Sequence, residues 1–527
     1  MKKIIYILIV ASLTSCDFLN QTPLDNVTPE NYYTTQEELE TALRGVYSTM
    51  SETALYANNM LGRMGLSADI GYEHYSSDEG TVGYYEVVPT DVKITNYWKK
   101  LYEGIGRANR LLENINKPQM DEDARNVIKG EALFLRGYYH FLLTVRFGDV
   151  PIILSVPKSG HADDVQIAKS SSRDVYRQAI ADMEAAIDLV KSASEINYGS
   201  RVTKSAVWGM LARVCLNMAG YPIYEPGMYE KARTYAAEVI NSGHHSLNPS
   251  FQDVFINYIQ DRYDIQESIF EVDFYGNGVG TYSNTAGMVG RNNGISFRNT
   301  EMPEIGYSIG TIRATAYYLS LYADGDLRKD WSIANFTYNS TTGEKVDVGT
   351  NQWIRFSGKF RREYELLSPK NTSYTPINFP LLRYSDVLLM YAEAVVADPS
   401  CNDGLELAKA YEYVNMVRRR GYGKPVNEQD VTVDLVNEGK ATLFDNIKDE
   451  RARELGHELL RKDDIVRWGE FYYRMKFIQS TVPPSYTSDY YVTARQIYGN
   501  VRERDEFWPI PSYELGINRK LTQNPGW

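Results

Sequence analysis

The sequence predicts a mainly α-helical protein, in which tetratricopeptide-like helical hairpins form a scaffold with a large insertion of loops and short strands. Apolar residues recur at helical spacing through much of the chain, in short helices that follow one another in pairs. Residues 245–380 lose this spacing and are rich in glycine, asparagine and aromatic residues. With 527 residues, the chain is long enough for a large core or for several domains.

The most apolar predicted helix lies within residues 130–151, GEALFLRGYYHFLLTVRFGDVP. Phe134, Tyr138 and Phe141 lie on one apolar stripe, and a second stripe runs beside it. Two adjacent stripes indicate a helix that is buried on most sides, and Gly148 is placed to end it. This helix should therefore be an inner member of the array.

The other helices are expected around it, mostly in pairs. A capping box from Thr35 to Glu38 begins the first helix, and small residues such as Gly104 and Gly209 stand where a neighbouring helix must approach. A charged helical region is expected to be joined to its neighbours by Arg–carboxylate pairs. The expected ranges are 98–116 with the helix from about 121, 173–191 with 203–219, then 229–242, 311–322, 381–397 with 405–420, and the charged region 440–475.

The N-terminus has the features of an export signal. Lys2 and Lys3 precede an apolar stretch at 4–13, which is too short to span a bilayer of about 30 Å as a helix. The sequence Leu-Thr-Ser-Cys that ends at Cys16 is similar to a bacterial lipobox, which implies cleavage before Cys16 and diacylglycerol on its sulfur. An ordinary secretion signal with a chance cysteine is the alternative.

The organisation predicted along the chain has three parts. A signal peptide (1–15) and a lipidated tether (16–34) precede a single domain at 35–527. Within this domain the expected ranges are helical repeats at about 35–244 and 381–420, a loop-rich insertion at about 245–380, and a C-terminal region at 421–527. A second irregular stretch, at 62–97, is rich in Gly, Ser, Asp and Tyr and is expected to be a long loop.

Composition and motifs exclude several classes of function. The net charge of −12 argues against binding to nucleic acid. Three cysteines and scattered histidines give no disulfide framework and no metal-ligand spacing, and no cofactor motif is present. The sequence Gly-Tyr-Ser-Ile-Gly around Ser308 matches a serine-hydrolase nucleophile elbow, but the acidic, proline-containing stretch before it does not suit a buried strand. A hydrolase that uses Ser308 is therefore a remote alternative, and we expect no enzyme activity.

Six motifs in the same order resemble the SusD/RagB family of bacterial surface lipoproteins. One departs from the family pattern, because Ser385-Asp386 replaces Ala-Glu. The motifs are W-x-x-L-Y-x-x-I-x-x-A-N at 98–109, the helix at 130–151, D-x-R at 326–328, the helix at 381–394, E-R-x-x-E-L…R-W-G at 450–469 and P-I-P…Q-N-P-G at 509–526.

The resemblance implies a function as well as a fold. It implies a lipoprotein that is anchored on the outer face of the outer membrane of a Bacteroidota-type bacterium and sits as a lid on a SusC-like TonB-dependent transporter. Such a protein captures oligosaccharides, or in some members peptides, and delivers them for import; the family has no catalytic residues.

Sugar rings favour flat aromatic side chains with polar groups at their edges, and both irregular regions have that composition. Asp69 also resembles, by position, the acid that begins the family's ligand loop. For each candidate, the alternative to contact with a ligand is a structural role, in which the side chain packs in the core or holds a loop in place. The candidate ligand residues are Asp69, Tyr72, Tyr84 and Tyr85 in the first region and Tyr282, Asn284, Arg291, Trp331, Trp353 and Arg355 in the second.

Overall fold

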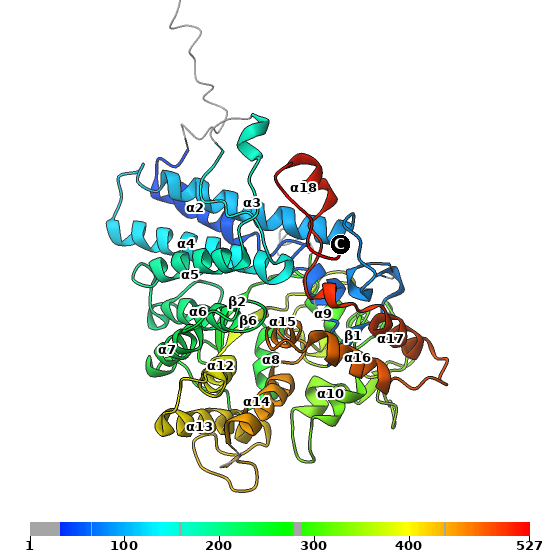
Figure 1. Ribbon diagram of the computed structural model, residues 1–527. Helices are drawn as coiled ribbons and strands as arrows, with labels where there is room; N and C mark the ends of the chain where they lie inside the picture. The colour runs from blue at the N-terminus through cyan, green and yellow to red at the C-terminus, as the bar shows by residue number, and fades with distance from the viewer. Residues whose placement is uncertain (1–31, 65, 79, 158–160, 279–285, 437–438) are drawn as a thin grey trace, which may run out of the picture.

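The computed structural model describes residues 32–64, 66–78, 80–157, 161–278, 286–436 and 439–527, and it is mainly α-helical, as predicted (Figure 1). Its α-helices are α2 (Gln36–Tyr47), α3 (Val92–Asn114), α4 (Glu122–Phe147), α5 (Ser172–Ala186), α6 (Lys204–Ala219), α7 (Met228–Asn241), α8 (Phe251–Ile259), α9 (Val289–Asn293), α10 (Ala316–Ser320), α11 (Lys329–Ser332), α12 (Tyr384–Ala397), α13 (Gly404–Gly421), α14 (Gly439–Leu455), α15 (Arg461–Arg467), α16 (Phe471–Thr481), α17 (Asp489–Asn500) and α18 (Ser512–Ile517).

The described strands are short and form three separate antiparallel pairs. Two of the pairs join strands that are far apart in the sequence, and the third joins neighbouring strands. Each pair is a separate two-stranded sheet. The pairs are β1 (Gly71–Glu73) with β3 (Ile312–Ala314), β2 (Ser268–Val272) with β6 (Phe379–Arg383), and β4 (Phe336–Tyr338) with β5 (Lys345–Asp347).

The helices α2 to α7, α12 and α13 stack into an array along one side of the molecule (Figure 1). Helix α4 is an inner member, as its two apolar stripes predict, and it packs against α3 and α5. The predicted capping box at Thr35 is confirmed, and Gly148 ends α4 with a positive φ of 70°. A β-carbon at Gly209 would overlap the side chain of Leu382, which confirms that a small residue is needed at this close approach.

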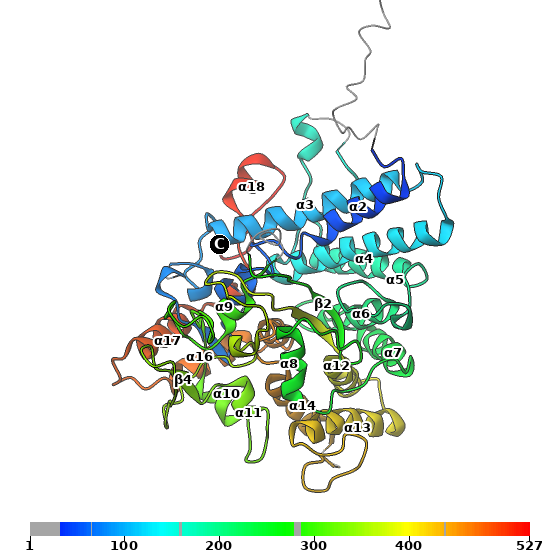
Figure 2. The same cartoon turned by 180° about the vertical axis from the view of Figure 1, so that it is seen from behind.

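The irregular regions gather on the other side of the molecule, together with helices from the C-terminal part of the chain. Seen from behind, α9, α10, α16, α17 and β4 lie together, away from the α2–α7 stack (Figure 2). Tyr85, Phe471 and Tyr498 belong to one buried aromatic cluster in this part of the molecule. The helical array therefore supports a second body of loops, short strands and C-terminal helices.

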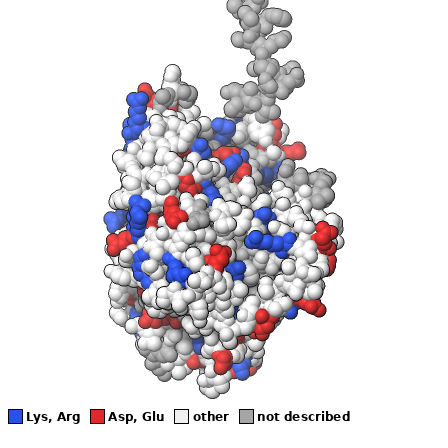
Figure 3. Space-filling view, turned by 90° about the vertical axis from the view of Figure 1, so that its right-hand side faces the viewer, with Lys and Arg blue, Asp and Glu red and all other residues white. Residues whose placement is uncertain are grey.

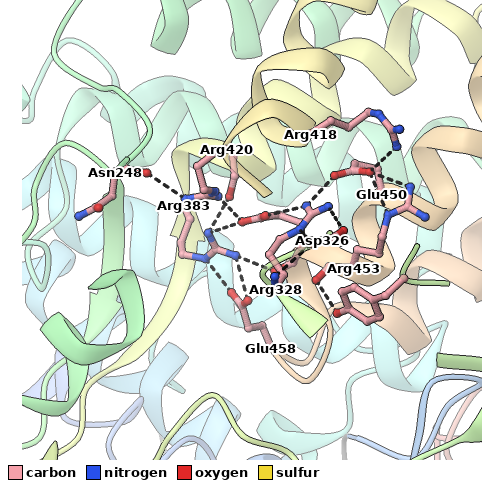
Figure 4. A network of polar contacts seen from close by, with 12 residues as sticks. Asn248, Asp326, Arg328, Arg383, Arg418, Arg420, Glu450, Arg453 and Glu458 are labelled. Atoms are coloured by element: carbon pink, nitrogen blue, oxygen red, sulfur yellow. Dashed lines mark hydrogen bonds and ion pairs between the residues drawn. The ribbon is translucent and has the colours of Figure 1, made fainter. Parts of the chain in front are cut away.

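A buried ion cluster joins these parts (Figure 4). Arg328, from the D-x-R motif of the insertion, bonds Glu450 of α14 at 2.6 Å, and Arg383 of β6 bonds Glu454 at 2.9 Å and Glu458 at 2.8 Å. Burial alone would raise the pKa of Glu454, but the guanidinium groups of Arg420, Arg383 and Arg328 outweigh it and lower the pKa to about 2. The predicted Arg–carboxylate contacts of the charged helical region are therefore confirmed.

Three predicted helices have different boundaries in the structure. The range 381–397 begins as strand β6, because these residues pair with β2, and α12 starts only at Tyr384. The range 311–322 divides into β3 and α10, because Thr315 caps a new helix. The charged region 440–475 divides into α14, α15 and the start of α16, with His457 and Leu459 at positive φ between the first two.

Smaller corrections concern the loops and the tail. The stretch 62–97 contains β1, two short 3-10 turns and the first residues of α3, so it is less irregular than expected. Prolines are unfavourable inside regular structure, yet the C-terminal tail after Pro509 and Pro511 forms the short helix α18. Cys215 is buried in α6 as a small apolar residue, and neither it nor Cys401 forms a disulfide. Among the described helices, none has the length and apolar character needed to cross a bilayer.

Candidate functional site

The two irregular regions meet at the β1–β3 pair. The backbone N–H of His74 continues the pairing by donating to the carbonyl of Thr311 at 2.7 Å. Next to the pair, the rings of Tyr72 and Trp353 lie 5.9 Å apart, and the Tyr72 hydroxyl donates to the Trp353 carbonyl. We call this contact region the loop junction.

Polar groups surround the loop junction on its outer side. The side-chain amide of Asn351 donates to the hydroxyl of Tyr490 at 2.7 Å, and His74 Nε2 lies 2.8 Å from the exposed carboxylate of Asp489. Burial and the nearby Arg313 lower the pKa of His74 to about 4, although Asp489 acts in the opposite direction. His74 is therefore neutral at pH 7.

The insertion also contacts the segment that lies between α2 and the first irregular region. The N–H of Met288 donates to the carbonyl of Ala57 at 2.8 Å, and the Asn292 amide donates to the side-chain oxygen of Asn58 at 2.7 Å. A cavity of about 300 Å³ opens beside these contacts, and we call it the loop hollow. Its walls are Ser48, Ser51, Glu52, Thr53, Ala57, Ala286, Met288 and Tyr374.

The ring of Tyr374 is held in place from several directions. The side-chain oxygen of Asn371 accepts the backbone N–H of Tyr374 at 3.1 Å, and the next residue, Thr375, exchanges two backbone hydrogen bonds with Gly287. Gly278 has a φ of 73° and lies so close to the ring that a β-carbon there would overlap it. The backbone at Tyr374 is therefore held in place, and one side of the ring packs against Gly278, before any ligand arrives, which reduces the entropic cost of binding.

The loop hollow combines a flat aromatic face with hydrogen-bonding groups. Glu52 supplies a carboxylate, which accepts a hydrogen bond from Lys100 at 3.2 Å, and the exposed Ser51 and Thr53 supply hydroxyls. Its volume lies at the lower end of the range of small-molecule sites. This arrangement can stack the apolar face of a sugar ring on Tyr374 while its hydroxyls bond at the rim.

The candidates from the first irregular region have partners inside the protein. Asp69 forms a buried two-point ion pair with Arg461, with both N···O distances at 2.8 Å. Tyr72 is buried at the loop junction, and Tyr84 is buried as well. Tyr85, also buried, donates its hydroxyl to the Ser67 carbonyl at 2.6 Å. Of the two interpretations left open by the sequence, this is the packing arrangement.

The candidates from the second region are placed differently from one another. Trp331 and Trp353 are buried, and the guanidinium of Arg361 lies 4.3 Å from the centre of the Trp331 ring. Arg291 and Arg355 are half-buried, and Arg355 donates to the Gly349 carbonyl at 2.8 Å. Tyr282 and Asn284 lie outside the described residues.

None of the eight candidates that the structure describes lines the loop hollow; the structure brings Tyr72 and Trp353 together elsewhere. The hollow instead uses Glu52 and Tyr374, which the sequence analysis missed. Tyr374 follows an Asn-Thr-Ser turn inside the predicted insertion, so its loop composition was a usable signal. Glu52 follows a helix, and no local pattern distinguishes it.

The structure also tests the hydrolase alternative at Ser308. Its hydroxyl is buried and donates to the carbonyls of Gly290 and Arg291, both at 3.1 Å. Ser308 pairs through its backbone with Phe297 and is not placed between a central strand and a helix, so the nucleophile elbow is not formed. Within the described ranges, no group of three acidic, His or Cys side chains is arranged to hold a metal ion.

Comparisons with known families agree with the motifs. A family described as "Starch-binding associating with outer membrane" matches residues 17–216, and the SusD family matches residues 328–527. A SusD-like protein of Formosa agariphila is 26% identical to this chain, and the alignment covers 100% of this chain and 99% of that protein. A SusD-like protein of Bacteroides ovatus is 24% identical, over 86% of this chain and 79% of its own length.

Solved structures give the same result for the fold. A SusD homolog from Bacteroides thetaiotaomicron superposes with a TM-score of 0.85 at 26% identity, covering 95% of this chain and 98% of its own. A laminarin-binding SusD-like protein superposes with a TM-score of 0.71 at 21% identity, covering 94% of this chain and 100% of its own. At that identity the second likeness shows the fold alone.

Proposed function

Because this chain belongs to the SusD/RagB family, we propose that it is a glycan-binding protein that captures oligosaccharides in the loop hollow. The observation that carries this proposal is that Tyr374, whose backbone is held by Asn371, lines an open cavity together with a carboxylate and hydroxyls, between the segment after α2 and the insertion. The laminarin-binding protein with the same fold supports a carbohydrate ligand.

The surface charge supports an uncharged ligand. Over the face turned to the viewer in Figure 3, Lys and Arg lie interspersed with Asp and Glu among larger uncharged areas. That face has no field of a single sign to attract a polyanion, and the net charge of −12 of the whole chain disfavours one further. Neutral oligosaccharides, recognised by stacking and hydrogen bonds, fit these conditions.

The cellular role is part of the same proposal. Lipidation at Cys16 would anchor the protein in the outer membrane, facing the exterior, and a SusC-like TonB-dependent transporter would receive the captured glycan. The family description, which refers to the outer membrane, supports this location. A Cys16→Ser variant should leave the membrane fraction and appear in the soluble fraction, and wild-type protein should co-purify with a TonB-dependent barrel from detergent-solubilised membranes.

The binding function is tested by native gel electrophoresis in gels that contain a polysaccharide, with laminarin, xyloglucan, starch, xylan and galactomannan as separate probes. The expected result is retardation in at least one gel, with no new reducing ends in the recovered polysaccharide. Retardation with none of these probes, together with calorimetric binding of a mixed tryptic peptide pool, would replace the glycan proposal by peptide binding. New reducing ends would indicate a hydrolase.

A further inference from the structure

A second and larger cavity, of about 480 Å³, lies next to the loop hollow along helix α2. We call it the helix hollow. Ser48 and Ser51 lie in the walls of both cavities, and both residues are exposed. A ligand that leaves the loop hollow in this direction therefore enters the helix hollow without crossing a buried barrier.

One wall of the helix hollow is a single face of α2, because Glu40, Leu43, Arg44 and Tyr47 recur at spacings of three and four residues. Its other lining residues include Tyr198, Ser200 and Arg201 from a turn, and the end of β2 with the residue that follows it. The cavity therefore lies between a helix face and a wall built from a turn and a strand end.

Two tyrosines form an aromatic rim at this cavity. Tyr198 lines it and is 38% exposed; Tyr263, at 41% exposed, lies beside it with ring centroids 6.0 Å apart. The hydroxyl of Tyr263 donates to Asp273 at 3.0 Å, which fixes that ring. Exposed rings that are held in place by their neighbours offer the flat apolar face on which sugar rings stack.

Polar groups that line the helix hollow below this rim are held in place by hydrogen bonds. Glu131 is buried and accepts hydrogen bonds from Tyr47 at 2.6 Å and from Arg201 Nε at 2.8 Å, so its charge is compensated. Burial lowers the pKa of Arg201, but Glu131 and a hydrogen bond with Tyr198 outweigh this and raise it. The guanidinium of Arg201, which is partly exposed, is therefore held in place by Glu131 beside the aromatic rim.

We infer that the helix hollow is a second subsite for the same oligosaccharide, which holds sugar units that extend beyond Tyr374 over Ser48 and Ser51. This inference rests on the proposed glycan-binding function and adds the size of the ligand to it. A chain that fills both cavities makes stacking contacts with Tyr374 and with Tyr198, whereas a disaccharide reaches one cavity. The protein is therefore selective for longer oligosaccharides over short ones of the same linkage.

The test is calorimetric titration with matched dimers and hexamers of the laminari-, cello-, malto-, xylo- and N-acetylchito-oligosaccharide series. In the series that binds, wild type should hold the hexamer at least about tenfold tighter than the dimer. Tyr198→Ala should reduce hexamer affinity by about five- to tenfold and leave dimer affinity unchanged. Tyr473→Ala, which removes an exposed ring on α16 that lines neither cavity, is the control and should bind as wild type.

The outcomes separate this inference from the function on which it rests. If no oligosaccharide and no polysaccharide binds, the glycan function fails, and the second subsite fails with it. If the hexamer binds but is no tighter than the dimer, or if folded Tyr198→Ala binds the hexamer as wild type does, the second subsite alone is overturned. Circular dichroism and thermal melting of each variant establish that it is folded.

Discussion

The hydroxyl of Tyr72 donates to the carbonyl oxygen of Trp353 at 2.9 Å, across a sequence separation of 281 residues. The same hydroxyl lies 3.2 Å from the carbonyl oxygen of Tyr490 on α17. One phenol therefore joins the first irregular region, the insertion and the C-terminal helices. Tyr72 and Trp353 are buried and Tyr490 is half-buried. The contact therefore fixes the loop junction and is not exposed to a ligand.

Removing this hydroxyl should weaken the fold. Tyr72→Phe keeps the ring but leaves the buried carbonyl of Trp353 without this donor, so we expect the free energy of unfolding to fall by about 1–2 kcal/mol. Urea unfolding followed by fluorescence measures this change. Tyr473→Phe, at a side chain that is 76% exposed, is the matched control and should change stability by less than about 0.5 kcal/mol. An unchanged urea midpoint for Tyr72→Phe would contradict the role of the hydroxyl.

Asp69 should matter for stability and not for affinity. It pairs with Arg461 in a buried two-point contact and lies 3.3 Å from Arg474, so Asp69→Asn leaves a buried cation without its partner. We expect a loss of about 3 kcal/mol or more in the free energy of unfolding. Asp324→Asn, at an exposed acid, should have little effect. Wild-type stability together with weakened oligosaccharide binding in Asp69→Asn would instead assign Asp69 to the ligand.

Stability at alkaline pH should depend on Glu271, which lines the helix hollow at the end of β2. Burial, and after it the charge of Asp273, raises the pKa of Glu271 to about 8. The folded state therefore favours the neutral carboxyl, and its contribution to stability is complete below the ordinary pKa of 4.5 and is lost as the pH rises to about 8.

Glu271→Gln imitates the neutral carboxyl and cannot ionise. It should match wild type at pH 5 and be more stable at pH 9, by an amount on the order of a few kcal/mol. Urea midpoints at the two pH values measure the difference, with Glu301→Gln at an exposed site as the control. Parallel pH profiles for wild type and Glu271→Gln would show that Glu271 ionises normally.

Much of the helical array was predictable from the sequence because its signals are local. The capping box at Thr35, the two stripes of α4 and the glycine that ends it depend on neighbours within one or two turns. The boundary at 381–397 was not predictable in this way. An apolar run satisfies strand and helix equally, and only the pairing of Phe379 with Val272, more than a hundred residues away, selects the strand.

The candidate site was harder to predict for the same reason. Loop composition pointed to the insertion, which supplies Ala286, Met288 and Tyr374, but not to residues 48–57, which form the rest of the loop hollow. Tyr72 and Trp353 are buried because they meet each other, whereas Tyr374 remains available because Gly278 and Asn371 hold it at a cavity. These are tertiary relationships, and a single sequence does not encode them in any local pattern.

The central claim is that Tyr374 holds a sugar ring in the loop hollow. Calorimetric titration of wild type, Tyr374→Ala and the control Tyr473→Ala against the oligosaccharide hexamers tests it most directly. We expect wild type and Tyr473→Ala to bind one series with equal affinity, and folded Tyr374→Ala to bind at least about tenfold more weakly. Wild-type affinity in Tyr374→Ala would contradict it.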